Sequence, residues 1–224
     1  MDTRIEPDTA RRVALTREGV LRTAVALADR GGVEAASMRK IAHELGVVPM
    51  ALYKHVANKD ELLDGMIDVV VGEIDPPPTD LEWKPAIRAR ILSARRALLD
   101  HPWASRVMES RTTPTPAVLA YMDSMIGMFL AGGFSMDLTH HAIHALGSRL
   151  MGFTQELFND NADVDREAEM WMAMADTYPS IYRLFFSVMH DDASVVGPGC
   201  DDQLEFEFAL DLLLDGLERL HDGA

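Results

Sequence analysis

Cysteine is nearly absent from this chain, since Cys200 is the only one among 224 residues. A single cysteine excludes an intramolecular disulfide bond and any metal site built from paired thiols. Because Cys200 stands in a glycine- and proline-rich segment, we interpret it as a loop thiol rather than as a redox sensor. The first residues lack the basic and then apolar layout of a secretory signal, so we expect a cytoplasmic protein.

Long apolar runs and catalytic motifs are also missing. The charge-free stretch between Asp123 and Asp137 is well short of the about 20 apolar residues that a membrane helix needs. The sequence contains no Gly-x-Ser-x-Gly elbow, no phosphate loop ending in Gly-Lys-Ser/Thr and no His-Glu-x-x-His motif. We therefore expect no membrane span, no enzymatic activity and no cofactor.

Positive charge is scarce, and only the amino-terminal part of the chain has a positive balance. The formal net charge is −15, yet residues 1–60 hold 10 Lys and Arg against 8 Asp and Glu, a balance of +2, whereas residues 61–224 hold 11 against 28, a balance of −17. DNA could therefore approach only the amino-terminal part, and non-specific DNA affinity should be weak. Acidic neighbours balance Arg4, Arg11 and Arg12, so we interpret this segment as a frayed terminus rather than as a minor-groove arm.

Residues 38–56 have the pattern of a helix-turn-helix. Ile41 faces inward on the first helix, and Gly46 can take the left-handed conformation that ends it. Pro49 suits the first turn of a second helix, on which Leu52 continues the buried side. The pattern predicts a second helix of about seven residues that reaches a DNA groove.

The outer face of this second helix carries side chains suited to DNA. Tyr53, Lys54 and His55 combine an aromatic ring, a cation and a ring donor, which fit phosphates and base edges better than a protein core. A half-buried packing ring is the alternative interpretation of Tyr53.

Capping residues predict a helix on each side of this motif. Thr16 can cap a helix that Gly31 and Gly32 end. Asn58 and Glu61 have the spacing of a capping box, which would open a helix from residue 59 to about residue 74. The amino-terminal part should therefore contain four helices.

Residues 16–74 resemble the DNA-binding domain of the tetracycline-repressor (TetR) family. The resemblance rests on Met38-Arg-Lys-Ile-Ala, Leu45-Gly-Val, Ala51-Leu-Tyr-Lys-His-Val and Asn58-Lys-Asp-Glu-Leu-Leu-Asp. It implies a DNA-binding domain over residues 1–74 and a helical effector-binding and dimerisation domain over residues 75–224. It also implies a repressor that binds a palindromic operator as a homodimer and is released by a small molecule. The alternatives are a constitutive DNA-binding regulator or activator without a ligand, and a helical enzyme or carrier whose helix-turn-helix is coincidental.

The rest of the chain shows helical periodicity without useful strand alternation, so the expected fold class is all-α. Helices are predicted over residues 83–99, about 102–111, 116–131, 136 to about 158, about 166–190 with a break at Tyr178-Pro179, and 201–220, with an acidic loop at 160–165. The last helix carries more apolar residues than one domain can bury. A second subunit would cover the excess, although a central position within its own monomer is the alternative.

The family's DNA-facing positions carry over to Arg39, Pro49, Met50, Tyr53, Lys54, His55 and Lys59. Arg39 and Met50 are candidates for base-edge and thymine-methyl contacts. Tyr53, His55 and Lys59 are candidates for contacts with the DNA backbone, and Lys54 could serve in either role.

The family's effector-surrounding helices carry over to nine candidate pocket residues. These are Trp103, Met108, Met122, Met125, Phe129, His144, Ser148, Met151 and Gln155. Eleven of the 14 methionines follow residue 60, and such flexible apolar groups can either line an adaptable pocket or simply fill the core. Met108 corresponds to a histidine that helps to hold drug-bound magnesium in the tetracycline repressors, so a largely apolar effector is expected instead.

His140, His141 and His144 have helical spacing, and two of them could share a metal ion. No thiol at matching spacing completes the ligand set. We therefore expect no metal site, and we assign these histidines to solvent and to one polar pocket contact.

Overall fold

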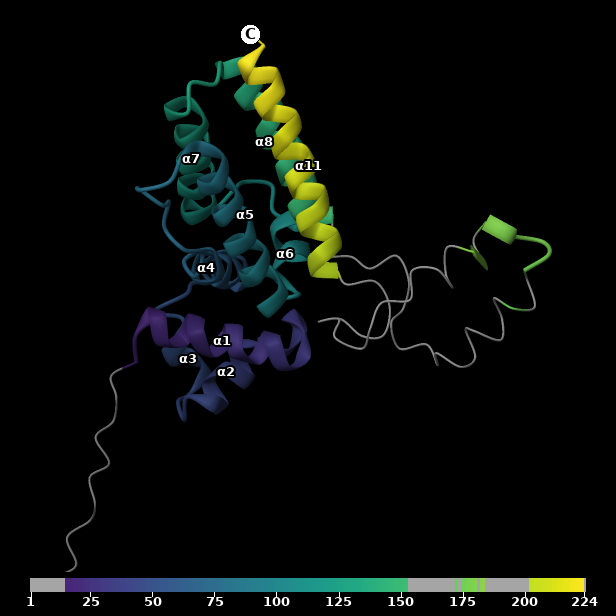
Figure 1. Ribbon diagram of the computed structural model, residues 1–224. Coiled ribbons are helices and arrows are strands. Elements are labelled where there is room, and N and C mark those ends of the chain that lie inside the picture. The colour runs from purple at the N-terminus through teal and green to yellow at the C-terminus, as the bar shows by residue number, and fades with distance from the viewer. Residues whose placement is uncertain (1–14, 153–171, 173–174, 181, 184–201, 224) are drawn as a thin grey trace, which may run out of the picture. The chain divides into compact units, whose positions relative to one another are not determined.

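The computed structural model describes residues 15–152, 172, 175–180, 182–183 and 202–223 (Figure 1). Within these ranges the regular structure is entirely helical, which confirms the predicted all-α fold class. The chain divides into two compact units, one formed by residues 1–74 with 96–121 and the other by residues 75–95 with 122–224. No helix in the described ranges is both long and apolar enough to cross a membrane.

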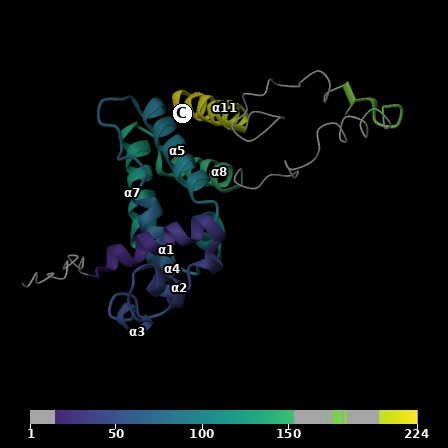
Figure 2. The ribbon, with the colours of Figure 1, turned by 90° about the horizontal axis from the view of Figure 1, so that it is seen from below.

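The first unit contains the helix-turn-helix. Its elements are α1 (Arg17–Gly31), a 3-10 turn (Val33–Ala35), α2 (Met38–Glu44), α3 (Pro49–Leu52), α4 (Lys59–Val71) and α6 (Ala104–Ser110). Helices α2 and α3 contact each other, and α2 also contacts α1 (Figure 2). Helix α1 packs against α4, which in turn contacts α6.

Side-chain caps begin three of these helices where the sequence places them. The Thr16 hydroxyl oxygen accepts the Gly19 N–H at 3.0 Å, and the Ser37 hydroxyl oxygen accepts the Lys40 N–H at 3.4 Å. At α4, Asn58 Oδ1 accepts the Glu61 N–H at 2.8 Å. The predicted caps at Thr16 and Asn58 are therefore confirmed, and each satisfies an amide that the helix leaves unbonded.

The capping box at α4 closes one residue earlier than its usual form. Glu61 Oε2 accepts the N–H of Ala57, at 2.7 Å, instead of the N–H of the cap residue Asn58. The helix then ends at Val71 rather than near Ile74, because Gly72, Glu73 and Ile74 continue only as turns.

A glycine brings α1 and α4 into close contact in the core of the first unit. A Cβ atom built on Gly65 would lie 2.6 Å from Leu21 Cδ2 and 2.9 Å from Leu21 Cδ1. Leu21 is itself buried, so it has little room to move. Glycine at position 65 therefore sets the distance between the two helices.

Gly65→Ala is expected to lower the free energy of unfolding by about 1–3 kcal/mol, because the added methyl overpacks the contact with Leu21. Urea unfolding followed by circular dichroism would measure the change. Gly127→Ala is the matched control, since nothing lies within 4 Å of a Cβ built there. It should stabilise α7 by about 0.5–1 kcal/mol through helix propensity alone, and equal effects of the two substitutions would contradict this packing.

The second unit consists mainly of long helices. They are most of α5 (Trp83–Asp100), most of α7 (Pro116–Ala131), α8 (Met136–Gly152) and α11 (Asp202–Asp222). Helices α8 and α11 lie side by side (Figure 1). Trp83, Phe129 and Phe134 form an aromatic cluster, with ring centroids 4.6 Å apart for Trp83 and Phe134 and 5.1 Å apart for the two phenylalanines.

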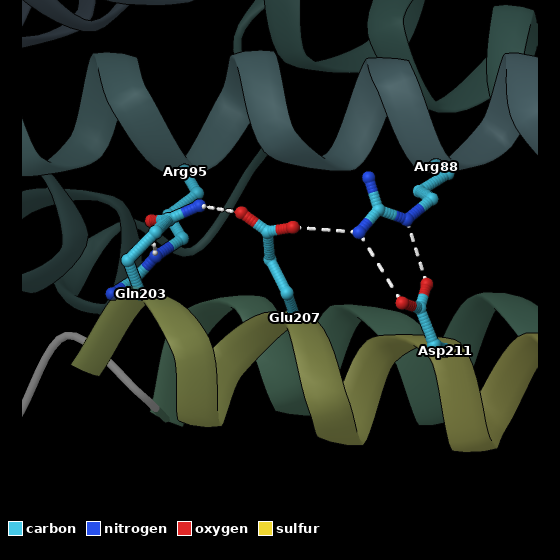
Figure 3. A network of polar contacts seen from close by, with 5 residues as sticks. All are labelled: Arg88, Arg95, Gln203, Glu207 and Asp211. Atoms are coloured by element: carbon cyan, nitrogen blue, oxygen red, sulfur yellow. Dashed lines mark hydrogen bonds and ion pairs between the residues drawn. The ribbon is translucent and has the colours of Figure 1, made fainter. Parts of the chain in front are cut away.

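A line of polar contacts holds α11 against α5 (Figure 3). The Arg88 guanidinium donates to Asp211 Oδ1 at 2.7 Å and to Glu207 Oε2 at 2.6 Å. One turn earlier, Gln203 donates to Glu207 at 2.5 Å and accepts from Arg95 at 3.1 Å. The hydrogen bond from Gln203 and then that from Arg88 lower the pKa of Glu207, so this carboxylate stays ionised.

Several sequence predictions fall outside the described residues. They concern the Arg4, Arg11 and Arg12 segment, the end of α8 beyond Gly152, the acidic loop at 160–165, most of the predicted helix over 166–190, and Cys200.

Candidate nucleic-acid interface

The turn between α2 and α3 has the geometry that the sequence predicts. Gly46 adopts a positive φ of 63°, and the Val47 N–H donates back to the carbonyl oxygen of Ala42 at 2.9 Å. Val48 is extended, and Pro49 occupies the first turn of α3, where a missing N–H costs nothing. This turn fixes the direction in which α3 leaves α2.

Helix α3 is shorter than predicted. It spans only Pro49–Leu52, and Tyr53 caps it, so the prediction of a seven-residue helix is wrong. The carbonyl oxygen of Leu52 accepts the N–H groups of both His55, at 2.8 Å, and Val56, at 3.0 Å. Val56 must reach the core, and Asn58 must be extended to cap α4, which leaves no room for another helical turn. Tyr53, Lys54 and His55 therefore lie in a turn.

Leu52 anchors α3 in the core of the helix-turn-helix. Its side chain is fully buried, as is that of Ile41 on α2, whereas Met50 on the opposite side of α3 is 72% exposed. Leu52 is thus the one buried residue of α3, whereas Pro49 and Met50 are exposed.

The predicted DNA-facing residues lie mainly at the surface. Tyr53 is 47% exposed, and His55 is half-buried, whereas Arg39, Pro49 and Lys54 are exposed. A duplex could therefore reach each of these side chains without a change in the core. Their roles as DNA contacts stay a prediction.

Val48 and Lys40 of the helix-turn-helix are exposed as well. Val48 is 68% exposed directly before α3, two residues before Met50 in the sequence, and Lys40 is exposed on α2. Exposed apolar side chains are what a thymine methyl group contacts in the major groove. The sequence reasoning gave Val48 no role, and the available signal was its position just before Pro49, where a valine cannot cap the helix.

Lys59 lies at the amino end of α4 and is paired weakly. Its Nζ is 3.4 Å from Glu34 Oε2, and the two side chains are 62% and 83% exposed. An exposed pair of this kind contributes little and is screened by salt. A DNA phosphate could therefore compete with Glu34 for the ammonium group.

The candidate effector residues are distributed between the two units. In the first unit the Trp103 ring is buried and donates its Nε1–H to Asp29 Oδ1 at 2.7 Å, and Met108 is half-buried. In the second unit Met125 and Phe129 are buried in the core. Four further candidates lie nearer the surface: Met122, His144 and Ser148 are exposed, and Met151 is half-buried. Gln155 lies outside the described residues, and the pocket itself stays a prediction.

The three histidines of α8 point to solvent. His140, His141 and His144 are all exposed, and the rings of His140 and His144 lie 4.6 Å apart between centroids. Across the part of the chain that the structure describes, no cluster of three or more metal-ligating side chains occurs.

Two sequence families match the chain. Residues 20–66 match the family described as bacterial regulatory proteins, tetR family, and residues 75–221 match the tetracyclin repressor-like, C-terminal domain. The first match contains the helix-turn-helix, and the second begins before α5 and ends within α11.

Individual proteins are similar over most of the chain. An HTH-type transcriptional repressor, DrrR1, from Streptomyces coeruleorubidus is 30% identical over 98% of this chain and 83% of its own length. An HTH-type transcriptional regulator from Saccharopolyspora erythraea is 37% identical over 132 residues, which span 58% of this chain and only 56% of that protein. The structure of ActR from Streptomyces coelicolor in complex with actinorhodin has a TM-score of 0.72 at 25% identity and covers 93% of this chain and 99% of the other.

Proposed function

Because the chain belongs to the TetR family of bacterial transcriptional regulators, we propose that it is a repressor that binds a palindromic operator as a homodimer and is released by a small, largely apolar effector. The family consists of transcriptional regulators and not of enzymes. Its two functional parts would be the DNA-binding domain, residues 1–74, and the effector-binding and dimerisation domain, residues 75–224. Since it acts on DNA, we place it in the bacterial cytoplasm.

The exposed helix-turn-helix is the observation that carries this proposal. Met50 on α3 and Val48 directly before it are exposed, and the cations Arg39 on α2 and Lys54 after α3 are exposed too. Exposed apolar groups suit the thymine methyl groups of a major groove, and exposed cations suit its acceptor edges. The acidic composition beyond residue 60 would keep the duplex at this end.

An exposed apolar stripe on α11 supports the dimer. Leu204, Phe208 and Leu212 follow one another at four-residue intervals and are 56%, 62% and 54% exposed. On the other side of the same helix, Phe206 and Leu210 are fully buried within their own unit. A second copy would cover the exposed stripe. A dimer would also carry two DNA-binding domains that contact one operator together, which gives the operator specificity that one short helix lacks.

Ion pairs connect α6 to α4 within the first unit and suggest how an effector could act. Arg111, directly after α6, lies 2.8 Å from Asp60 and 2.7 Å from Asp64, both in the first half of α4. A displacement of α6 would therefore pull on the helix that begins at Lys59. An effector could bind more tightly to the protein with α4 in one position than with α4 in another. It would then change the separation of the two DNA-binding domains of the dimer and release the operator.

The effector can be sought with a defined probe. ActR was solved with actinorhodin, so actinorhodin is a rational first compound to test against a fluorescent operator duplex. The proposal would be supported if a saturating concentration of the compound displaced the duplex and changed the distance between spin labels on the two DNA-binding domains of the dimer. If a broad panel of small apolar compounds changed neither operator affinity nor label separation, the protein would be a constitutive regulator.

Arg39 and Lys59 should affect DNA binding differently. Arg39→Ala is expected to relax the preference at one operator position, where a base contact is worth about 1–3 kcal/mol. Lys59→Ala should weaken binding to every duplex and reduce the salt slope by about 1. Anisotropy titrations on operator and random duplexes at several salt concentrations would separate the two effects, and equal losses on both duplexes for both variants would contradict the division.

A further inference from the structure

His101 joins three segments of the first unit that are far apart in the sequence. It follows α5 directly, and its side chain is only 9% exposed. Its Nδ1 lies 2.8 Å from Oδ1 of Asp29 on α1, and its Nε2 lies 3.0 Å from Oε2 of Glu73, two residues beyond α4. The ring therefore connects the carboxyl ends of α1 and α4.

Both partners of the ring are carboxylates, and this decides its charge. An ionised carboxylate only accepts hydrogen bonds, so both ring nitrogens must donate if both contacts are to hold. Only the imidazolium form carries a proton on each nitrogen. A neutral ring would turn one lone pair toward a carboxylate oxygen, and that contact would become repulsive.

Trp103 fixes one of the two carboxylates. Its indole N–H donates to the same Oδ1 of Asp29 that faces His101, at 2.7 Å. Asp29 is therefore held by two donors, whereas the Glu73 carboxylate contacts the ring of His101 and is 42% exposed. When the ring loses a proton, the contact with Glu73 is the one expected to open.

Burial and charge act on the ring in opposite directions. Burial, the largest single effect, lowers the pKa of His101, but the hydrogen bonds to Asp29 and Glu73 and the charges of the same two carboxylates outweigh it, so the pKa is raised above its ordinary 6.5. These are the two charged groups that face the ring from α1 and from the end of α4. A raised pKa means that the contact stabilises the fold fully below the ordinary pKa and ceases to do so as the pH rises through the folded value.

We propose that His101 is a positioning residue for α4: as an imidazolium it ties the carboxyl end of α4 to α1, and loss of its proton frees that end. The consequence for DNA rests on the proposed function, since α4 begins at Lys59, a candidate phosphate contact. Freeing one end of α4 widens the range of positions available to it, so operator affinity should fall as the ring deprotonates.

The direct test needs no DNA. Nitrogen NMR of the full-length protein with labelled histidine would follow the His101 ring over about pH 5.5 to 9. At the acidic end both ring nitrogens should be protonated, and the midpoint for loss of the proton should lie above that of ordinary histidine. Its absence from the spectrum of His101→Gln identifies the signal. Glu73→Gln should lower the midpoint. Asp100→Asn removes the carboxylate next to His101 in the sequence, which is not one of the two that contact the ring, and should leave the midpoint near the wild-type value.

Hydrogen exchange then tests the positioning role. Protection of the amides at residues 70–72, corrected for intrinsic exchange, should fall by about an order of magnitude as the pH rises through the His101 midpoint. In His101→Gln the corrected protection should be low and independent of pH, and Glu73→Gln provides the same test should His101→Gln fold poorly. A midpoint at or below that of ordinary histidine, or wild-type protection that does not change with pH, would overturn the proposal.

Operator affinity tests whether His101 affects DNA binding. Across the same pH window it should fall several-fold more in the wild-type protein than in His101→Gln. A protein that binds no operator at any pH would refute the proposed function while the NMR and exchange results still decide the role of His101. Identical pH dependence of binding in the two proteins would overturn the connection of His101 to DNA.

Discussion

Phe208→Glu combined with Leu212→Glu is expected to convert the protein to monomers and to weaken operator binding at least about a hundredfold. Both side chains are exposed on α11 within one chain, so the two glutamates should not disturb the fold of the unit that carries them. Between two copies the same carboxylates would be buried without partners and would face each other as like charges, which opposes association. Sedimentation velocity would measure the oligomeric state, and fluorescence anisotropy would measure operator affinity.

The control for this variant introduces the same charges elsewhere. Leu81→Glu with Leu119→Glu also replaces two exposed leucines, 47% and 52% exposed, but neither lies on the α11 stripe. This control should remain dimeric and retain its operator affinity. A Phe208 and Leu212 double variant that remained dimeric and bound the operator as tightly as the wild type would place the subunit contact elsewhere.

Leu52→Ala should strongly destabilise the helix-turn-helix. The side chain is fully buried, and α3 has only four residues, so one truncation removes most of what holds the helix in place. Large-to-alanine substitutions at such sites cost about 2–5 kcal/mol. Urea unfolding should show the loss, and operator binding should weaken at temperatures where the wild type is unaffected.

Met50→Ala, on the same short helix, should have the opposite profile. Met50 is 72% exposed, so its truncation should change the free energy of unfolding by less than about 0.5 kcal/mol. Preference for thymine at one operator position should nevertheless decrease. If Leu52→Ala left stability unchanged, or if Met50→Ala destabilised the protein by a similar amount, the inward and outward faces of α3 would have been assigned incorrectly.

Local signals in the sequence were sufficient for most helix boundaries. Thr16 and Asn58 cap their helices as predicted, and Gly46 has the positive φ that the turn requires. These features depend on residues a few positions apart, which is why they can be read without a structure. Helix α5 likewise begins at Trp83 as its periodicity indicates.

Features that depend on distant residues could not be predicted in this way. The length of α3 is set by the need to bury Val56 and to cap α4, and this tertiary demand overrides the helical preference of Ala51-Leu-Tyr-Lys. The contacts of His101 with Asp29 and Glu73 span 72 and 28 residues. No spacing rule identifies such partners, because they meet only after the helices have packed.

The effector candidates show a similar limit of sequence reasoning. The resemblance selected whole helices, but individual side chains on one helix differ in environment: Met125 and Phe129 of α7 are buried, whereas Met122 is 39% exposed. A helical stripe of apolar residues has the same pattern whether it faces the core or a ligand.

Selection of preferred duplexes from a random DNA pool tests the central proposal most directly. The purified protein should enrich an inverted repeat whose half-sites are spaced by about one helical turn, ~34–36 Å, and its affinity for that duplex should fall with salt. Enrichment of no sequence at low ionic strength, or of a single half-site without a repeat, would contradict a paired helix-turn-helix that reads DNA.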